Sequence, residues 1–292
     1  METMAAHIGG ELSDLVPVVT RGERLDRDAC LRLWRTDDLT GLGVLANLVR
    51  ERVNGNRAFV RAALRASAGE DLESLLSATD GASAGELHLE GTDLHRLVRR
   101  ARELAPNLRP RACTWTELEQ AAGAGGSEPQ RVLRGLADAG LHHLAGGALN
   151  ERHLPWVEAA ASLGMRAELH WFVHGDEPAE VAVDTLLELR RLSEVYPIFA
   201  CLTPLLRTPP AEGVEMPDPT GYNCLRAIAV GRLCLDRMPH VRGSVEALGE
   251  SVMQVAQWYG ADDAGSVAPP ARERLAELLR AAGREPVELL IE

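Results

Sequence analysis

Histidine and glutamate side chains are predicted to share one face of a β-strand. In Arg166–His174 apolar residues alternate with polar ones, so Glu168, His170 and His174 fall on one side of an extended segment. Two imidazoles beside a carboxylate suit a divalent metal ion or proton transfer. The competing interpretations are a polar cavity whose groups pair with one another or with water, and a pocket for an organic ligand.

Similar groups lie on two other segments that are predicted to be strands. His88 and Glu90 alternate on one of them, and His142 or His143 begins the other. If these strands surround one barrel, their polar faces meet Glu168, His170 and His174 inside it. We expect His170 and His174 to line the interior near the mouth at the C-terminal ends of the strands, as a candidate ligand pocket with no assigned catalytic residue or metal ion.

Other residue patterns give no catalytic or metal site. The five cysteines are at least ten residues apart, which fits neither a zinc site nor a disulfide framework. The glycine-rich segment 123–126 lacks the Lys and Ser/Thr of a phosphate loop, and no serine lies in a nucleophile elbow. Adjacent Asp262 and Asp263 point apart in most backbones, so we expect a loop or helix-start role for them.

The elements that position these residues follow two hydrophobic periods. Helical spacing, as in Leu42–Val53, separates short segments with the composition of strands. These predicted strands are Arg57–Leu64, Glu86–Glu90, Leu108–Thr114, Leu141–Leu144, Arg166–His174 and Ile198–Thr203. Their starts lie 22 to 33 residues apart, which is the length of a strand–helix–strand unit. The sequence therefore predicts an α/β fold, a partial or full TIM-like barrel of about six parallel strands with helical N- and C-terminal extensions.

Composition indicates one globular domain over residues 1–292. We expect a helical N-terminal extension (1–56), a barrel core (57–207) and a helical C-terminal region (218–292). The net charge is −12, with 31 basic residues, all Arg, against 43 acidic ones, which argues against binding to nucleic acid or to an anionic membrane. No apolar stretch reaches the roughly 18 residues of a membrane helix, and no secretory signal is seen, so we expect a cytoplasmic protein without membrane insertion.

Several motifs, in order along the chain, resemble one enzyme family. They are segments 52–57, 113–118, 133–147, 184–190 and 202–205 and, most specifically, the C-terminal block 218–221, 225–236, 239–240 and 260–263. Together they resemble the aminofutalosine synthases and futalosine cyclases, which are radical S-adenosylmethionine enzymes of menaquinone biosynthesis. The resemblance runs from about residue 30 to residue 268 and implies the barrel fold. It also adds Glu177, which keeps the place of the family's acidic residue after the fifth strand, to the candidate pocket.

One departure from the family concerns its cofactor. The family's first strand leads into C-x-x-x-C-x-x-C, whose thiolates hold a four-iron cluster, whereas here it leads into Arg65–Asp71, and the chain has no cysteine between Cys30 and Cys113. We therefore expect no cofactor; a 4Fe-4S cluster and S-adenosylmethionine are expected only if the chain keeps the family's chemistry.

Three functions stay open at this point. The favoured one is a cluster-less pseudoenzyme that acts as a partner, scaffold or ligand-binding protein in menaquinone biosynthesis, with an intact paralogue or another protein of that pathway as its partner. The second is an enzyme of another class that uses the polar His/Glu face. The third is a divergent aminofutalosine synthase.

Overall fold

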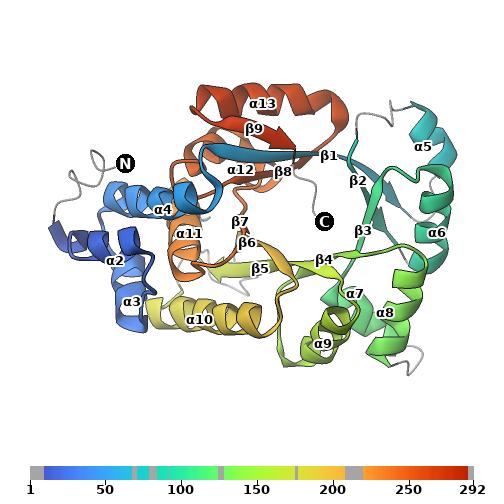
Figure 1. Ribbon diagram of the computed structural model, residues 1–292, viewed down its shortest axis with the longest axis horizontal. Helices are drawn as coiled ribbons and strands as arrows, with labels where there is room; N and C mark the ends of the chain where they lie inside the picture. The colour runs from blue at the N-terminus through green and yellow to red at the C-terminus, as the bar shows by residue number, and fades with distance from the viewer. Residues whose placement is uncertain are drawn as a thin grey trace, which may run out of the picture.

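The computed structural model describes residues 10–67, 71–78, 84–91, 93–123, 128–174, 177–207 and 220–288. Parallel strands form a curved sheet in the order β7-β6-β5-β4-β3-β2-β1-β8, and β9 also pairs with β1 (Figure 1). The strands are β1 (Arg57–Ser67), β2 (Glu86–Glu90), β3 (Arg109–Thr114), β4 (His143–Gly147), β5 (Arg166–His174), β6 (Phe199–Arg207), β7 (His240–Val241), β8 (Asp263–Val267) and β9 (Glu285–Glu288).

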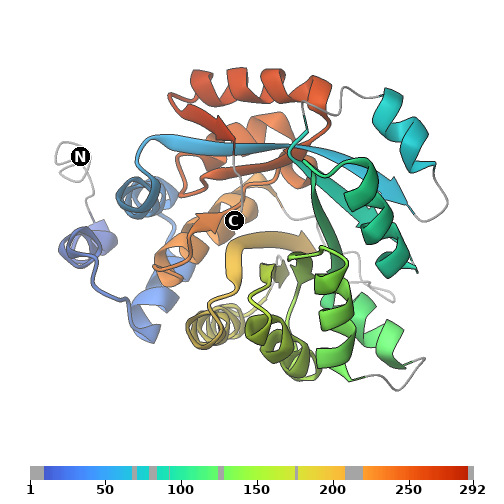
Figure 2. The same ribbon diagram turned by 45° about the vertical axis from the view of Figure 1, so that its right-hand side comes forward.

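Helices surround the sheet on its outer side (Figure 2). The α-helices are α2 (Leu15–Arg21), α3 (Arg27–Arg35), α4 (Leu39–Asn54), α5 (Leu72–Ala78), α6 (Leu94–Leu104), α7 (Trp115–Gly123), α8 (Pro129–Asp138), α9 (Leu154–Ser162), α10 (Ala179–Val195), α11 (Gly221–Cys234), α12 (Val245–Ala256) and α13 (Arg272–Ala281). Short 3-10 turns cover Gly10–Leu12, Glu151–His153 and Pro269–Ala271. No helix in these described ranges is long and apolar enough to cross a membrane.

The predicted strand number of about six was too low. All six predicted segments form strands, but β7, β8 and β9 lie after residue 218, where the sequence predicted helices. These strands carry little pattern, because β7 is two residues long, β8 reads Asp-Ala-Gly-Ser-Val and β9 reads Glu-Pro-Val-Glu. They lengthen the barrel wall and lie between and after α11, α12 and α13, the helices of this region.

The additional strands bring the barrel close to closure. Gly243 donates a backbone hydrogen bond to Asp263 (2.9 Å), and Asp262 donates one to Val241 (3.1 Å), so the segment around β7 meets β8. On its other side β8 pairs with β1, with a shift in register between Phe59 and Arg61. The parallel, nearly closed barrel places the C-terminal ends of its strands around one mouth.

Strand β5 follows the alternation expected from its sequence. Leu169 and Trp171 are buried on the helix side, where the Trp171 ring lies 5.5 Å from that of Trp34 in α3. Glu168 and His170 face the interior instead. On the neighbouring strand β4, Gly146 (φ +73°) lies so close to β5 that a Cβ would stand 1.9 Å from the carbonyl oxygen of Glu168. Glycine is therefore required where the two strands meet.

Candidate functional site

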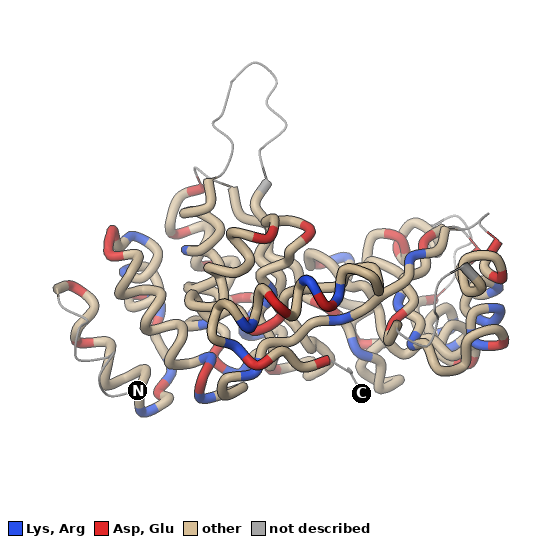
Figure 3. Tube along the Cα trace, turned by 90° about the horizontal axis from the view of Figure 1, so that it is seen from above, with Lys and Arg blue, Asp and Glu red and all other residues tan. Residues whose placement is uncertain are grey.

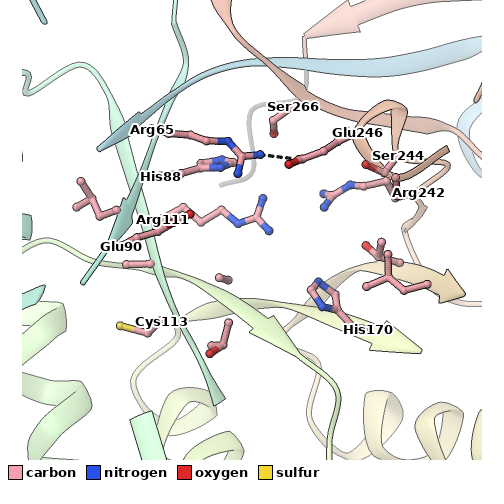
Figure 4. A pocket seen from close by; sticks show the side chains of 18 of the residues that line it. Arg65, His88, Glu90, Arg111, Cys113, His170, Arg242, Ser244, Glu246 and Ser266 are labelled. Carbon is pink, nitrogen blue, oxygen red and sulfur yellow. Dashed lines mark hydrogen bonds and ion pairs between the residues drawn. The ribbon is translucent and has the colours of Figure 1, made fainter. Parts of the chain in front are cut away.

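A pocket of about 350 Å³ lies at the mouth of the barrel (Figure 4). The polar and charged side chains that line it are Arg65, His88, Glu90, Arg111, Thr114, Glu117, His170, Thr203, Arg242, Ser244, Glu246 and Ser266. The guanidinium groups of Arg111 and Arg242 face one another across the pocket (Figure 4). At the rim Arg65 of β1 forms an ion pair of 2.5 Å with Glu246 in the first turn of α12.

Glu168 of β5 lies beneath the pocket and is 0% exposed. It accepts hydrogen bonds from Arg242 (2.5 and 2.6 Å) and pairs with Arg111 at 2.5 Å and with Arg61 at 3.5 Å. Burial opposes ionisation of this carboxyl, but the guanidinium groups, that of Arg111 foremost, hold its pKa below the usual value. Glu168 is therefore an ionised anchor for arginines that reach the pocket.

Asp263 anchors two of the same arginines. It accepts from Arg61 (2.5 Å) and from Arg242 (2.9 and 3.0 Å) and is fully buried. Its neighbour Asp262 forms a buried ion pair with Arg232 and lies 2.6 Å from His240 Nδ1. The expected loop or helix-start role for this acidic pair was wrong, because both carboxylates are parts of buried charge networks at the start of β8.

The imidazoles of the interior differ in their partners. His88 Nε2 lies 2.9 Å from Glu86, and His170 Nε2 lies 3.8 Å from Glu168. His143 Nε2 is buried without a hydrogen-bond partner among the described residues, and burial, helped by the charge of Arg111, lowers the pKa of His143 to about 4. Burial also works against Glu86, yet Arg61 and His88 hold the pKa of Glu86 at about 2.

The structure brings together some of the candidate residues. His88, Glu90 and His170 line the pocket, with Glu168 beneath them. His142 is exposed at the start of β4. His174 and Glu177 line a separate cavity of about 180 Å³ together with Trp34, Tyr222, Asn223 and Arg226, so the expectation that His170 and His174 share one interior surface was wrong. The end of β5 leads away from the barrel interior toward α3 and α11.

Sequence reasoning missed the arginines, which dominate the site. Arg61 and Arg111 interrupt segments that otherwise read as apolar strands, Arg57–Leu64 and Leu108–Thr114. Arg65 follows directly after the first of these segments, where β1 continues to Ser67. Burying a guanidinium is costly unless a carboxylate is paired with it. An arginine inside a predicted apolar strand therefore indicates a buried ion pair, and this signal could have identified Arg61 and Arg111.

The chemistry available to this pocket follows from its donors. Guanidinium groups suit the recognition of a carboxylate or phosphate. A metal ion is not indicated, because the described ranges contain no group of three or more His, Cys, Asp or Glu side chains suited to binding one.

The thiols do not fit a cluster held by three cysteines. Cys113 is the penultimate residue of β3, Cys201 is inside β6 and Cys224 lies on α11. Cys30 and Cys234 contact each other between α3 and α11. Burial raises the pKa of Cys113 to about 12 and that of Cys201 well above the usual value, which opposes thiolate formation. Within the segment Arg65–Asp71, residues 68–70 lie outside the described part of the chain.

Comparison with known sequences confirms the resemblance. No family model matches the chain. The aminodeoxyfutalosine synthase of Streptomyces coelicolor is 28% identical over 94% of this chain and 91% of that protein. That of Thermus thermophilus is 27% identical over 94% of both chains. A cyclic dehypoxanthine futalosine synthase of Streptomyces coelicolor is 26% identical over 59% of this chain and 45% of that protein.

Solved structures share the barrel fold. Methylornithine synthase (PylB) superposes with a TM-score of 0.69 at 16% identity, covering 93% of this chain and 96% of the other. The FeFe-hydrogenase maturase HydG from Carboxydothermus hydrogenoformans gives a TM-score of 0.65 at 13% identity, covering 94% of this chain and 79% of the other. The chain therefore shares the barrel fold of these two structures.

The comparisons correct the expectation that no cofactor is involved. The relatives that align with 94% of the chain are synthases of the radical S-adenosylmethionine class, whose members use a 4Fe-4S cluster and S-adenosylmethionine. Those groups are therefore the cofactors of the proteins to which this chain is related, although its described cysteines do not form the corresponding ligand set.

Proposed function

We propose that this relative of the aminodeoxyfutalosine synthases is a ligand-binding protein of the futalosine route, and that it binds a small carboxylate-bearing molecule at the mouth of its barrel. The supporting observation is the convergence of Arg65, Arg111 and Arg242 on one pocket. Buried carboxylates fix two of these guanidiniums in place, so little side-chain entropy is lost when a ligand binds.

The hydrogen-bond donors of Arg111 support the binding of an anion that is added to the existing ion pairs of the pocket. A guanidinium carries five N–H donors, and the Nη2 atom of Arg111 lies 2.5 Å from Glu168. The guanidinium of Arg111 lies in the pocket (Figure 4), where a ligand carboxylate can accept from its remaining donors. Arg65 at the rim would then exchange Glu246 for the incoming anion.

A second candidate function is a divergent aminodeoxyfutalosine synthase. It is favoured by similarity that spans 94% of this chain and 91% of the Streptomyces relative, since it extends over the whole barrel. In both proposals the protein works beside another protein of the menaquinone route, either an intact paralogue or a neighbouring enzyme.

Calorimetric titration tests the ligand-binding function. The probes are aminodeoxyfutalosine, the compound in the relatives' name, and benzoate as a minimal aromatic carboxylate. We expect binding of aminodeoxyfutalosine that weakens about tenfold in Arg65→Gln, since one charged hydrogen bond contributes about 1.5–3 kcal/mol. Arg191→Gln, which removes an equally exposed arginine from α10, should leave the affinity unchanged. Absence of binding, or equal affinity in Arg65→Gln, would contradict the proposal.

Product analysis separates the two functions. The chain is supplied anaerobically with iron, sulfide, a strong reductant and S-adenosylmethionine, and 5′-deoxyadenosine is measured by chromatography. Formation of this product in proportion to the protein would show cleavage of S-adenosylmethionine, which the divergent synthase requires and the binding protein does not.

A further inference from the structure

Two cysteines that are far apart in the sequence are in direct contact. The sulfur atoms of Cys30 in α3 and Cys234, the last residue of α11, lie 2.7 Å apart, although 204 positions separate them in sequence. Both side chains are 0% exposed. A disulfide bond has a sulfur–sulfur distance of about 2.05 Å, so the bond needs only a small approach of the two atoms.

Arg190 of α10 holds the two segments in register. Its Nη1 donates to the carbonyl oxygen of Leu25, just before α3, at 2.9 Å and to that of Cys234 at 3.3 Å. The same guanidinium therefore positions the start of α3 and the end of α11, and its charge favours a thiolate nearby.

The two sulfurs have different roles in this contact. Cys234 donates its S–H to Cys30, and this hydrogen bond, together with the charge of Arg190, lowers the pKa of the Cys30 thiol. Burial raises the pKa of Cys234 well above the usual value. Cys30 is therefore the nucleophile of the pair, with Cys234 as its proton donor.

We propose that Cys30 and Cys234 are a redox-modification site, at which a hydroperoxide converts the pair into an internal disulfide. The Cys30 thiolate attacks one peroxide oxygen, the O–O bond breaks, and Cys30 becomes a sulfenic acid. The leaving oxygen takes up the proton that the Cys30 thiol lost on ionisation and departs as water or an alcohol. The Cys234 sulfur then attacks Cys30, its proton leaves with the displaced hydroxide as water, and the S–S bond forms. One peroxide accepts the two electrons that the two thiols lose.

The surrounding structure explains how a buried pair can react and why it is specific. Helix α3 lies at the edge of the molecule (Figure 1), so local opening exposes Cys30 without opening the barrel. Cys224 is ten residues from Cys234 on the same helix, about 15 Å away along its axis, and so cannot substitute for Cys30.

The experiment counts thiols in the full-length chain before and after treatment with hydrogen peroxide, and maps the linked peptides by mass spectrometry. Of the five cysteines, three should remain reactive in the denatured wild-type protein after oxidation, and dithiothreitol should restore all five. The Cys30→Ala and Cys234→Ala variants should keep all four of their thiols at the same dose. The matched control Cys224→Ala should fall from four to two.

The melting temperature provides a second measurement. The disulfide closes a loop of 204 positions, so Tm should rise on oxidation of the wild type and of Cys224→Ala and return on reduction. Retention of all five thiols, or a linked peptide that lacks Cys30 or Cys234, would overturn the proposal. This site is independent of the proposed ligand, since its readouts involve no ligand binding.

Discussion

Glu168 is the residue on which the interior charges converge. It is fully buried and compensates Arg61, Arg111 and Arg242, so loss of its charge leaves guanidiniums without their shared partner. Removing one partner of a buried ion pair lowers the free energy of unfolding by about 3–5 kcal/mol, because the remaining charge is left uncompensated.

We therefore expect Glu168→Gln to lower the free energy of unfolding by about 3–5 kcal/mol, as measured by urea denaturation. Glu188→Gln serves as the control, because Glu188 forms an exposed pair with Arg191 on α10 and should change stability by less than about 1 kcal/mol. Equal effects of the two substitutions would show that the interior network does not hold the barrel together.

His143, whose Nε2 atom is buried, makes stability depend on pH in a defined window. Its pKa falls from 6.5 to about 4 on folding, so between these values the unfolded chain binds more protons than the folded one. Stability is complete above pH 6.5 and falls as the pH approaches 4; the contribution of this residue amounts to about 2 kcal/mol at pH 5.

The measurement compares urea unfolding at pH 7 and pH 5 in the wild type and in His143→Gln. The variant should lose about 2 kcal/mol less on acidification, whatever its stability at pH 7. Glu86, with its pKa held at about 2, acts in a lower window and does not interfere. The same acid dependence in both proteins would mean that His143 is not buried in its neutral form.

Among the elements, the pairing of β4 and β5 places a strict demand on one glycine. Gly146→Ala combines the strain of φ +73° with a clash against the backbone of β5, whereas Gly164→Ala, at φ +66°, has no atom within 4 Å of the new methyl group. We expect Gly164→Ala to cost about 1–2 kcal/mol and Gly146→Ala to cost clearly more or to prevent folding. Circular dichroism and urea denaturation measure both, and equal costs would contradict the close approach.

The elements also show which parts of the fold a sequence can predict. Strand β5 was predicted with its bounds and its alternation, because nine residues provide a full period, but the separate cavity at His174 was not predicted. Strand β7 has two residues and β9 contains Pro286, so neither carries a period, and their pairing with distant strands defines them. For the site, the histidines of β2 and β5 were found by type, but the arginines were missed because their role depends on carboxylates from other strands.

At the scale of the whole molecule, charges of both signs alternate along the outer trace (Figure 3), and the unusual concentration of charge lies inside the barrel. The wall around it depends on the C-terminal residues. Strand β9 pairs with the N-terminal half of β1, and β2 pairs with the C-terminal half.

A chain ending at Arg284 should therefore be less stable and more prone to associate. It leaves Arg57–Val60 of β1 without β9 as a neighbour, although Phe59 keeps its pairing with β8, and an exposed strand edge is a site for intermolecular pairing. Light scattering during slow heating measures this association, with a full-length Val287→Thr variant as the control that keeps the backbone of β9. Identical scattering of the truncated and full-length chains would contradict this role for β9.

The pairing of β1 with β8 and β9 also sets an order of events during translation. Strand β1 leaves the ribosome long before its neighbours Asp263–Val267 and Glu285–Glu288 are synthesised. Until then β1 lacks these partner strands, and Arg61 lacks the carboxylate of Asp263. Ribosome-bound chains that stop before residue 263 thus lack the strand that pairs with β1 and brings the barrel close to closure.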